Sequence, residues 1–194
     1  MLRVMVAPDS QGLGGDARRW LLDWARRVMR AHLAGERLPE PGLHPAEVDL
    51  RRPCFVSLHT RRGELRGCIG TFDDSEALWA AVRSMAVAAA TRDPRFDPMR
   101  AGELDDVVVE ISALTPRVPI RADDVIVGRH GLWVSRGARH GVLLPQVPEP
   151  YGWDRVEFLE HTCVKAGLPR HAWKDPETRL EAFEAEVFSE EHPA

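Results

Sequence analysis

The sequence has few cysteines and no long hydrophobic run, and each shortage removes a class of protein. No stretch reaches the roughly 18 apolar residues that a membrane-spanning helix requires. The first eight residues have neither the apolar core nor the small-residue cleavage site of a secretory signal, so we expect none. Cys54, Cys68 and Cys163 are an odd number and widely spaced, which indicates neither a disulfide framework nor a zinc site. We therefore expect a cytoplasmic protein with reduced thiols.

The sequence also lacks a strong excess of either charge and the common nucleotide-binding motifs. Its 30 acidic and 26 basic residues give a formal net charge of −4, which argues against a protein that coats nucleic acid through bulk positive charge. The glycine patterns of dinucleotide-binding folds, P-loops and α/β-hydrolases are missing. No His-x-His pair is present, so we expect neither a dedicated metal site nor a cofactor.

Hydrophobic periodicity predicts three helices and several strands. Between residues 14 and 33, apolar side chains recur every three or four positions with arginines opposite them, as in an amphipathic helix. Residues 107–114 are rich in β-branched side chains, which is typical of a strand. In chain order, the expected elements are helix 14–33, strands 54–60 and 64–72, helix 75–91, strands 107–114, 125–128, 132–135 and 141–144, helix 154–166, and a last strand at 183–187.

The order of these elements indicates the fold class. Neighbouring strands are joined by hairpins rather than by crossover helices, which favours antiparallel pairing. We expect an α+β fold with a mixed, largely antiparallel sheet and helices packed on it. The length suits a single domain over residues 1–194, with a long proline-containing loop at 35–52 and a frayed tail at 190–194.

The second strand of the first hairpin carries the candidate catalytic residues. Because side chains alternate along a strand, Arg66 and Cys68 are expected to share a face. A guanidinium favours the thiolate form of a neighbouring cysteine, so Cys68 is the candidate nucleophile and Arg66 its activator. Gly67 and Gly70 have no side chains and are expected to leave room for a substrate beside the sulfur. The alternative is that Cys68 only packs, as buried cysteines often do.

Five further residues are candidates for substrate binding. Asp93, Arg95 and Phe96 follow the second helix and present a carboxylate, a guanidinium and an aromatic ring, which suits an anionic or planar ligand. The alternative for Asp93 and Arg95 is an internal ion pair. Gln146 follows a hairpin strand and either contacts a ligand or satisfies loop backbone groups. Lys165 lies near the end of the third helix, where a cation also complements the helix dipole.

Two groups of basic residues near the first hairpin have open interpretations. His44 and His59 are candidates for a general base toward Cys68, although no spacing places either of them beside the sulfur. The arginine pairs at 51–52 and 61–62 either contact a phosphate backbone, with nearby aromatic rings stacking a base, or solubilise the ends of strands.

A set of short motifs resembles the signature of the AMMECR-type domain, also called AmmeMemoRadiSam system protein A. The most distinctive is Leu-Arg-Gly-Cys-Ile-Gly at 65–70, within a hairpin strand. The resemblance covers nearly the whole chain with compatible spacing. The segments that carry it are 55–58, 65–72, 93–96, 110–112, 141–147, 152–154 and 165–169.

The resemblance implies a fold and a setting, but no settled reaction. It implies an α+β fold with two subdomains that flank a cleft lined by the segment 65–70. It also implies association with a Memo-type protein and a radical S-adenosylmethionine protein. Function must still be argued from the site. We expect an enzyme or enzyme component that acts on a small or RNA-linked substrate through Cys68. The alternative is an adaptor without catalysis that binds RNA, a nucleotide or a protein.

Overall fold

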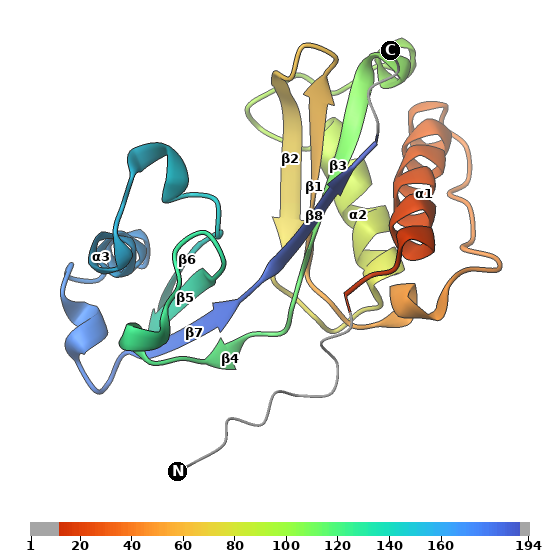
Figure 1. The fold of residues 1–194 in the computed structure, drawn as a ribbon. Coiled ribbons are helices and arrows are strands. Elements are labelled where there is room, and N and C mark those ends of the chain that lie inside the picture. The colour runs from red at the N-terminus through yellow and green to blue at the C-terminus, as the bar shows by residue number, and fades with distance from the viewer. Residues whose placement is uncertain (1–11, 191–194) are drawn as a thin grey trace. The chain divides into compact units, whose positions relative to one another are not determined.

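A computed structural model describes residues 12–190 of the chain (Figure 1). The segment in which a secretory signal was considered lies outside the described residues, as do residues 191–194 of the expected frayed tail. The chain divides into two compact units, Met1–Ala113 with Glu186–Ala194, and Leu114–Ala185. Of the helices in residues 12–190, none is both long enough and apolar enough to cross a membrane.

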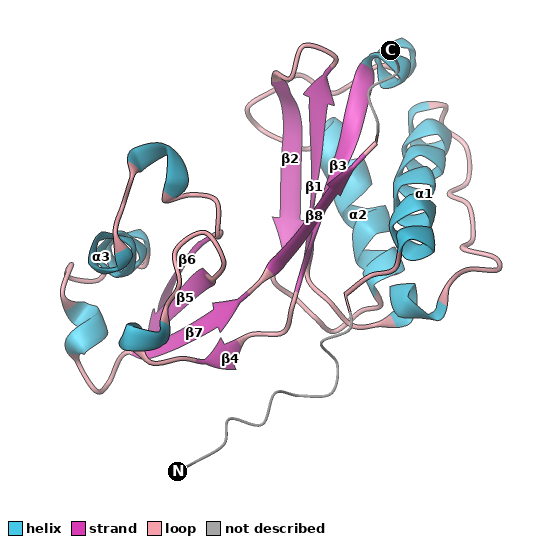
Figure 2. Ribbon diagram, in the orientation of Figure 1, coloured by secondary structure: helices cyan, strands magenta, loops and turns pink. Residues whose placement is uncertain are grey.

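The first unit is a four-stranded sheet with two helices on one side (Figure 2). The strand order is β2-β1-β3-β8, so β2 lies at an edge. Helix α1 packs on α2, and the indole N–H of Trp24 in α1 donates to the backbone oxygen of Trp79 in α2 at 2.9 Å. The elements are α1 (Gly15–Leu33), β1 (Cys54–Thr60), β2 (Leu65–Thr71), α2 (Leu78–Thr91), β3 (Val107–Leu114) and β8 (Ala185–Ser189).

The two faces of the first sheet differ in chemistry. Cys54, Val56 and Leu58 alternate along β1 and are fully buried in the core shared with α1 and α2. Ser57 lies between them in sequence and therefore faces away from the helices. The strand register sets Ser57 opposite Cys68 on β2 and opposite Glu110 on β3. A polar row thus crosses three strands on the face opposite the helices.

The second unit is another four-stranded sheet, with the order β4-β7-β5-β6 and α3 packed against β5 and β6. Leu132 is fully buried against Phe158 and Leu159 of α3, and Val134 against Cys163. Asp154 caps α3, since its carboxylate accepts from the backbone N–H of Glu157. The elements are β4 (Val118–Pro119), β5 (Gly131–Arg136), β6 (Arg139–Leu143), α3 (Arg155–Lys165) and β7 (Arg179–Phe183).

The α+β class and the largely antiparallel pairing are confirmed, and the sequence prediction is wrong in several details. There are two sheets rather than one, because the expected last strand is two strands, β7 and β8, that belong to different sheets. Residues 125–128 do not form a strand, and a turn covers residues 127–129. Helix α2 begins at Leu78 instead of residue 75, since Asp73 accepts from the N–H of Ser75 in a local turn. The loop at 35–52 contains one short 3₁₀ turn, Ala46–Asp49.

Candidate functional site

Cys68 is the only partly exposed cysteine of the three in the chain. It lies in β2 on the face away from the helices, and the Ser57 hydroxyl donates to its sulfur at an Oγ–Sγ distance of 3.2 Å. Cys54 and Cys163 are fully buried. Burial raises the pKa of the Cys54 thiol to about 12 and also raises the pKa of Cys163. Both buried thiols are therefore protonated and shielded, which leaves Cys68 as the cysteine available for chemistry.

A β-bulge in the first hairpin brings Ser57 and Cys68 together. Leu58 pairs with Gly67, but the next residue, His59, pairs with Leu65, so the register skips Arg66. Without this irregularity the hairpin would pair Ser57 with Gly67, and the Ser57 side chain would lie on the opposite face of the sheet from that of Cys68. The bulge therefore creates the contact between the hydroxyl and the sulfur.

The turn after α2 closes the open edge of β2 at Cys68. The backbone N–H of Cys68 donates to Asp93 Oδ2 at 2.8 Å, and its carbonyl accepts from Arg95 Nη2 at 3.2 Å. Both backbone groups therefore point away from β1. Cys68 and Ser57 then form a non-hydrogen-bonded cross-strand pair, the kind in which side chains come closest. Asp93 and Arg95 take the place of a neighbouring strand.

Asp93 and Arg95 also form a strong ion pair. Arg95 donates from Nε to Asp93 Oδ1 at 2.9 Å and from Nη2 to Oδ2 at 2.7 Å. The Asp93 side chain is only 2% exposed, whereas that of Arg95 is 54% exposed. The Arg95 hydrogen bond is the main reason why the pKa of Asp93 lies well below its usual value, and the N–H of Cys68 acts in the same direction. The pKa of Arg95 is raised, chiefly by Asp93 and further by Cys68.

The expected role of Arg66 as activator of Cys68 is not what its contacts show. Its guanidinium donates to Glu103 Oε2, at 3.0 Å from Nη2 and 3.3 Å from Nε. Arg66 is the residue that the bulge leaves unpaired, so the strict alternation used to place it beside Cys68 breaks there. The guanidinium in contact with Cys68 is that of Arg95.

The room expected beside Gly67 and Gly70 is filled by the chain itself. A Cβ on Gly67 would lie 2.2 Å from the backbone oxygen of Ala89, so glycine lets α2 approach the strand. A Cβ on Gly70 would lie 2.1 Å from the ring of Phe55. Both positions require glycine for close packing, and neither side-chain position is open to a substrate.

The other candidate residues lie in two places. Phe96 is in the first unit, where the Arg95 guanidinium lies 5.5 Å from its ring centroid. Gln146 and Lys165 belong to the second unit and are both exposed, Gln146 in the turn after β6 and Lys165 in the last turn of α3. The structure thus gathers Cys68, Asp93, Arg95 and Phe96 within one unit.

The two histidines considered as a general base are not hydrogen-bonded to Cys68 within the described part of the chain. His44 contacts Asp49 at 3.1 Å and lies beside Trp20, with ring centroids 5.2 Å apart and ring planes tilted by 48°. His59 shares the sheet face of Ser57, and its Nε2 lies 3.8 Å from Glu110 Oε1. Residues 12–190 contain no group of three His, Cys, Asp or Glu residues placed to hold a metal ion.

The arginine pairs at 51–52 and 61–62 do not form a common patch. Arg52 is buried and donates to Glu186 at 2.7 Å and to the carbonyl of Ala113 at 3.1 Å. Arg61 donates to the backbone oxygen of Asp105 at 2.8 Å. Arg52 therefore has a structural role, which weakens the interpretation of these pairs as a phosphate-binding surface.

Sequence reasoning missed Ser57, Glu110 and Glu103 as neighbours of the candidate catalytic residues. Ser57 and Glu110 lie within segments that carry the family resemblance, which was a usable signal. Ser57 and Glu110 lie in one row with Cys68 only because of the strand register, and Glu103 contacts Arg66 across 37 positions of sequence. Neither relationship can be read from local sequence.

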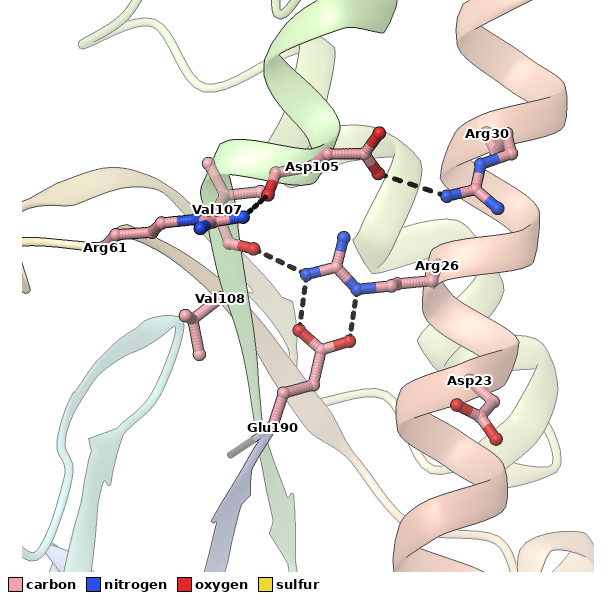
Figure 3. Close-up of a pocket in the computed structure, with 8 residues that line it drawn as sticks. All are labelled: Asp23, Arg26, Arg30, Arg61, Asp105, Val107, Val108 and Glu190. Carbon is pink, nitrogen blue, oxygen red and sulfur yellow. Dashed lines mark hydrogen bonds and ion pairs between the residues drawn. The ribbon is translucent and has the colours of Figure 1, made fainter. Parts of the chain in front are cut away.

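The first unit has a cavity of about 480 Å³ whose lining residues are joined by ion pairs (Figure 3). Arg26 from α1 points toward Glu190 and donates to both oxygens of its carboxylate, from Nε and from Nη2. The same guanidinium donates to the carbonyls of Leu104 and Val107 at 2.8 and 2.5 Å. Asp105 accepts from Arg30 through its side chain and from Arg61 through its backbone. Most of these charged groups are paired with one another or with backbone carbonyls. We therefore interpret the residues around the cavity as a structural junction between α1, β3 and the end of β8.

Comparison with known proteins identifies relatives over nearly the whole chain. A family model described as AMMECR1 matches residues 22–188. A protein of Methanothermobacter thermautotrophicus is 43% identical over 187 residues, which cover 92% of this chain and 97% of the relative. Protein MJ0810 of Methanocaldococcus jannaschii is 41% identical over 178 residues, 88% of each chain. The crystal structure of the uncharacterized protein PH0010 from Pyrococcus horikoshii matches with a TM-score of 0.79 and 40% identity, over 91% of this chain and 94% of that one. None of these descriptions names an activity.

Proposed function

We propose that this chain, which belongs to the AMMECR1 family, is an enzyme or enzyme component that acts through the thiol of Cys68. The observation that carries the proposal is the setting of the sulfur. Cys68 is partly exposed while the other two cysteines are buried, its sulfur accepts a hydrogen bond from Ser57, and a guanidinium contacts its backbone. A partly exposed sulfur with a hydrogen-bond donor beside it and a guanidinium on its own backbone is a setting suited to a cysteine that reacts as nucleophile or carrier.

Each neighbour of Cys68 has a distinct part in the proposed chemistry. Ser57 holds the sulfur by its hydroxyl. Asp93 fixes the backbone of Cys68 and orients Arg95. The half-exposed Arg95 guanidinium has five N–H donors, of which Asp93 and Cys68 occupy only part, so it can also bind a carboxylate or phosphate of a substrate. An anionic small molecule or an RNA-linked group fits this arrangement.

The proposed setting of the activity is a system with a Memo-type protein and a radical S-adenosylmethionine protein. It rests on the family resemblance alone. Co-purification of the tagged chain with these two proteins from a cell that encodes all three tests it. Recovery of neither partner would leave the chain acting alone and contradict this part of the proposal.

The reactivity of Cys68 is tested by alkylation of the folded protein. Iodoacetamide at neutral pH, followed by peptide mass spectrometry, is expected to modify Cys68 at least about a hundredfold faster than Cys54 and Cys163. Equal rates at the three cysteines would overturn the proposal.

Cys68→Ser distinguishes catalysis from an adaptor function. In cells that depend on this gene, the variant is expected to fold and bind its partners but to lose function. Full complementation by Cys68→Ser would instead favour an adaptor that binds RNA, a nucleotide or a protein.

A further inference from the structure

The sheet of the second unit carries a column of stacked cationic and aromatic groups. The Arg117 guanidinium lies 4.2 Å from the ring centroid of Trp133, and the ring of His140 stacks on Trp133 with centroids 4.8 Å apart and an interplanar angle of 5°. Arg117 also pairs with Glu181 at 3.9 Å. His140 is exposed, so this column presents an imidazole surface to solvent.

The strand register places this column on the face of the sheet opposite α3. Leu132 and Val134 of β5 are buried against α3, so Trp133 and Ser135 point the other way. Ser135 pairs with His140 on β6 and with Arg179 on β7. His140, Ser135 and Arg179 therefore form one row across three strands, with neighbouring strands about 4.8 Å apart.

A cavity of about 310 Å³ lies at the Ser135–Arg179 end of this row. It is lined by Ser135, Arg136, Gly137, Glu177 and Arg179. Arg136 is engaged by Thr178 at 3.1 Å and by Asp175 at 3.1 Å. Arg179 is exposed, and its side chain makes no hydrogen bond or ion pair within residues 12–190, so its guanidinium is available to a ligand.

We propose that this face binds a nucleotide, with the base stacked on His140 and the phosphate held by Arg179. Planar rings stack on aromatic side chains, and a guanidinium matches the geometry of a phosphate. The hydroxyl of Ser135 lies between the two groups, where a sugar hydroxyl would be. The cavity, which Ser135 and Arg179 line, takes the sugar and the phosphate, and the base lies outside it on His140.

Glu177 sets the charge that the site tolerates. Its carboxylate lines the same cavity as Arg179, so a second or third phosphate would meet a negative charge. The site therefore selects a single phosphate, as in a nucleoside monophosphate or in one unit of a single-stranded RNA.

The proposal does not depend on the chemistry proposed for Cys68. Every residue in it lies between 117 and 181, in the second unit, whereas Cys68 and Arg95 lie in the first. The variant Cys68→Ser should therefore bind nucleotides as the wild-type chain does.

Titration calorimetry with the full chain tests the site. AMP and UMP are expected to bind, adenosine and inorganic phosphate each at least about tenfold more weakly, because each lacks one of the two recognised groups. His140→Ala and Arg179→Gln are each expected to weaken AMP binding about tenfold or more, while His140→Phe, which keeps a planar ring, retains it. Absence of AMP binding at millimolar concentration, or equal binding by inorganic phosphate, would overturn the proposal.

Arg139→Gln is the matched control. Arg139 lies next to His140 on β6, but it faces α3 and donates to the carbonyl of Gly167 at 3.1 Å. Loss of this charge should leave AMP binding unchanged, and an effect equal to that of Arg179→Gln would show that only general charge matters. A six-nucleotide single-stranded RNA distinguishes the sources. Tighter binding than AMP, with the same response to His140→Ala, identifies RNA, whereas binding no tighter than AMP identifies the free nucleotide.

Discussion

Asp93 accepts a hydrogen bond at 2.8 Å from the backbone N–H of Cys68, across 25 positions of sequence. The contact joins the turn after α2 to the edge of β2, and Arg95 completes it from the same turn. One carboxylate therefore seals a strand edge and positions a guanidinium next to the cysteine. Asp93 is buried and therefore has a structural role, whereas Arg95 is half exposed and can also contact a substrate.

Asp93→Ala should lower the free energy of unfolding by about 2–3 kcal/mol. The substitution leaves the N–H of Cys68 without an acceptor at the strand edge and removes the partner of Arg95. Urea denaturation measures the change. Asp97→Ala, in the same turn but exposed, is the control and should stay within about 0.5 kcal/mol of the wild type. Equal stability of the two variants would refute the structural role of Asp93.

Stability should fall in acid, and Asp93 should account for a measurable part of the fall. Its pKa is lower in the folded chain than in the unfolded chain, so the folded state favours the ionised form. This stabilisation is complete above the unfolded pKa of about 3.9 and disappears as the pH falls toward the folded value. Thermal melts from about pH 6 down to about pH 3 should show a shallower decline for Asp93→Asn than for the wild type. If the melting temperatures of the variant and the wild type fall equally with pH, the pKa of Asp93 is not lowered by folding.

Gly67→Ala should destabilise the first unit by about 3 kcal/mol or more. The new methyl group would meet the backbone oxygen of Ala89, which cannot move unless α2 shifts. Gly70→Ala should cost less, because a Phe55 ring can rotate away. Gly102→Ala has nothing within 4 Å of the new carbon and serves as the control. Chemical denaturation of the three variants gives the ranking, and a Gly67→Ala protein as stable as Gly102→Ala would contradict the packing.

The sequence predicts the local elements of this fold better than the contacts between them. The strand at 107–114 and the helix that ends at Lys165 follow from β-branched residues and from apolar spacing, both of which act over a few positions. The split of the last strand into β7 and β8 depends on the pairing of each half with a distant strand. No local pattern encodes that pairing.

The candidate site shows the same division. Cys68 and the turn at 93–96 are found from local motifs, since a strand with two glycines and a rigid helix exit are visible in the sequence. The bulge that skips Arg66 is not visible, and it decides which side chains meet Cys68. For this reason the sequence pointed to Arg66 as the cation beside the sulfur, while the contacts point to Arg95.

Arg95→Gln should slow the alkylation of Cys68 more than Arg66→Gln does. Arg95 donates to the carbonyl of Cys68, so the substitution removes the guanidinium that contacts this residue, whereas the Arg66 guanidinium contacts Glu103 instead. We expect a decrease of roughly three- to tenfold for Arg95→Gln and less than about twofold for Arg66→Gln. Rates with iodoacetamide at pH 7, measured on folded protein, check this order. A larger effect at Arg66 would restore it as the activator.

Arg26→Gln should destabilise the first unit by about 2–3 kcal/mol, because one guanidinium joins three elements there. Arg26 of α1 grips Glu190 after β8 and donates to carbonyls at 104 and 107, and the Glu190 carboxylate also accepts from the N–H of Val109 at 2.9 Å. Removing the guanidinium leaves a partly buried carboxylate without its cation.

Arg30 provides the matched control for this junction, since it is one turn further along α1 and is 66% exposed. Within residues 12–190 its side chain makes one ion pair, with Asp105. Arg30→Gln should change the free energy of unfolding by less than about 1 kcal/mol. Hydrogen exchange adds a local readout. The Val109 amide should exchange faster in Arg26→Gln, because Glu190 is no longer held against it, and should be unaffected in Arg30→Gln. If the two variants protect Val109 equally, Arg26 does not organise the junction, and β8 is held by its pairing with β3 and by the Arg52–Glu186 contact instead.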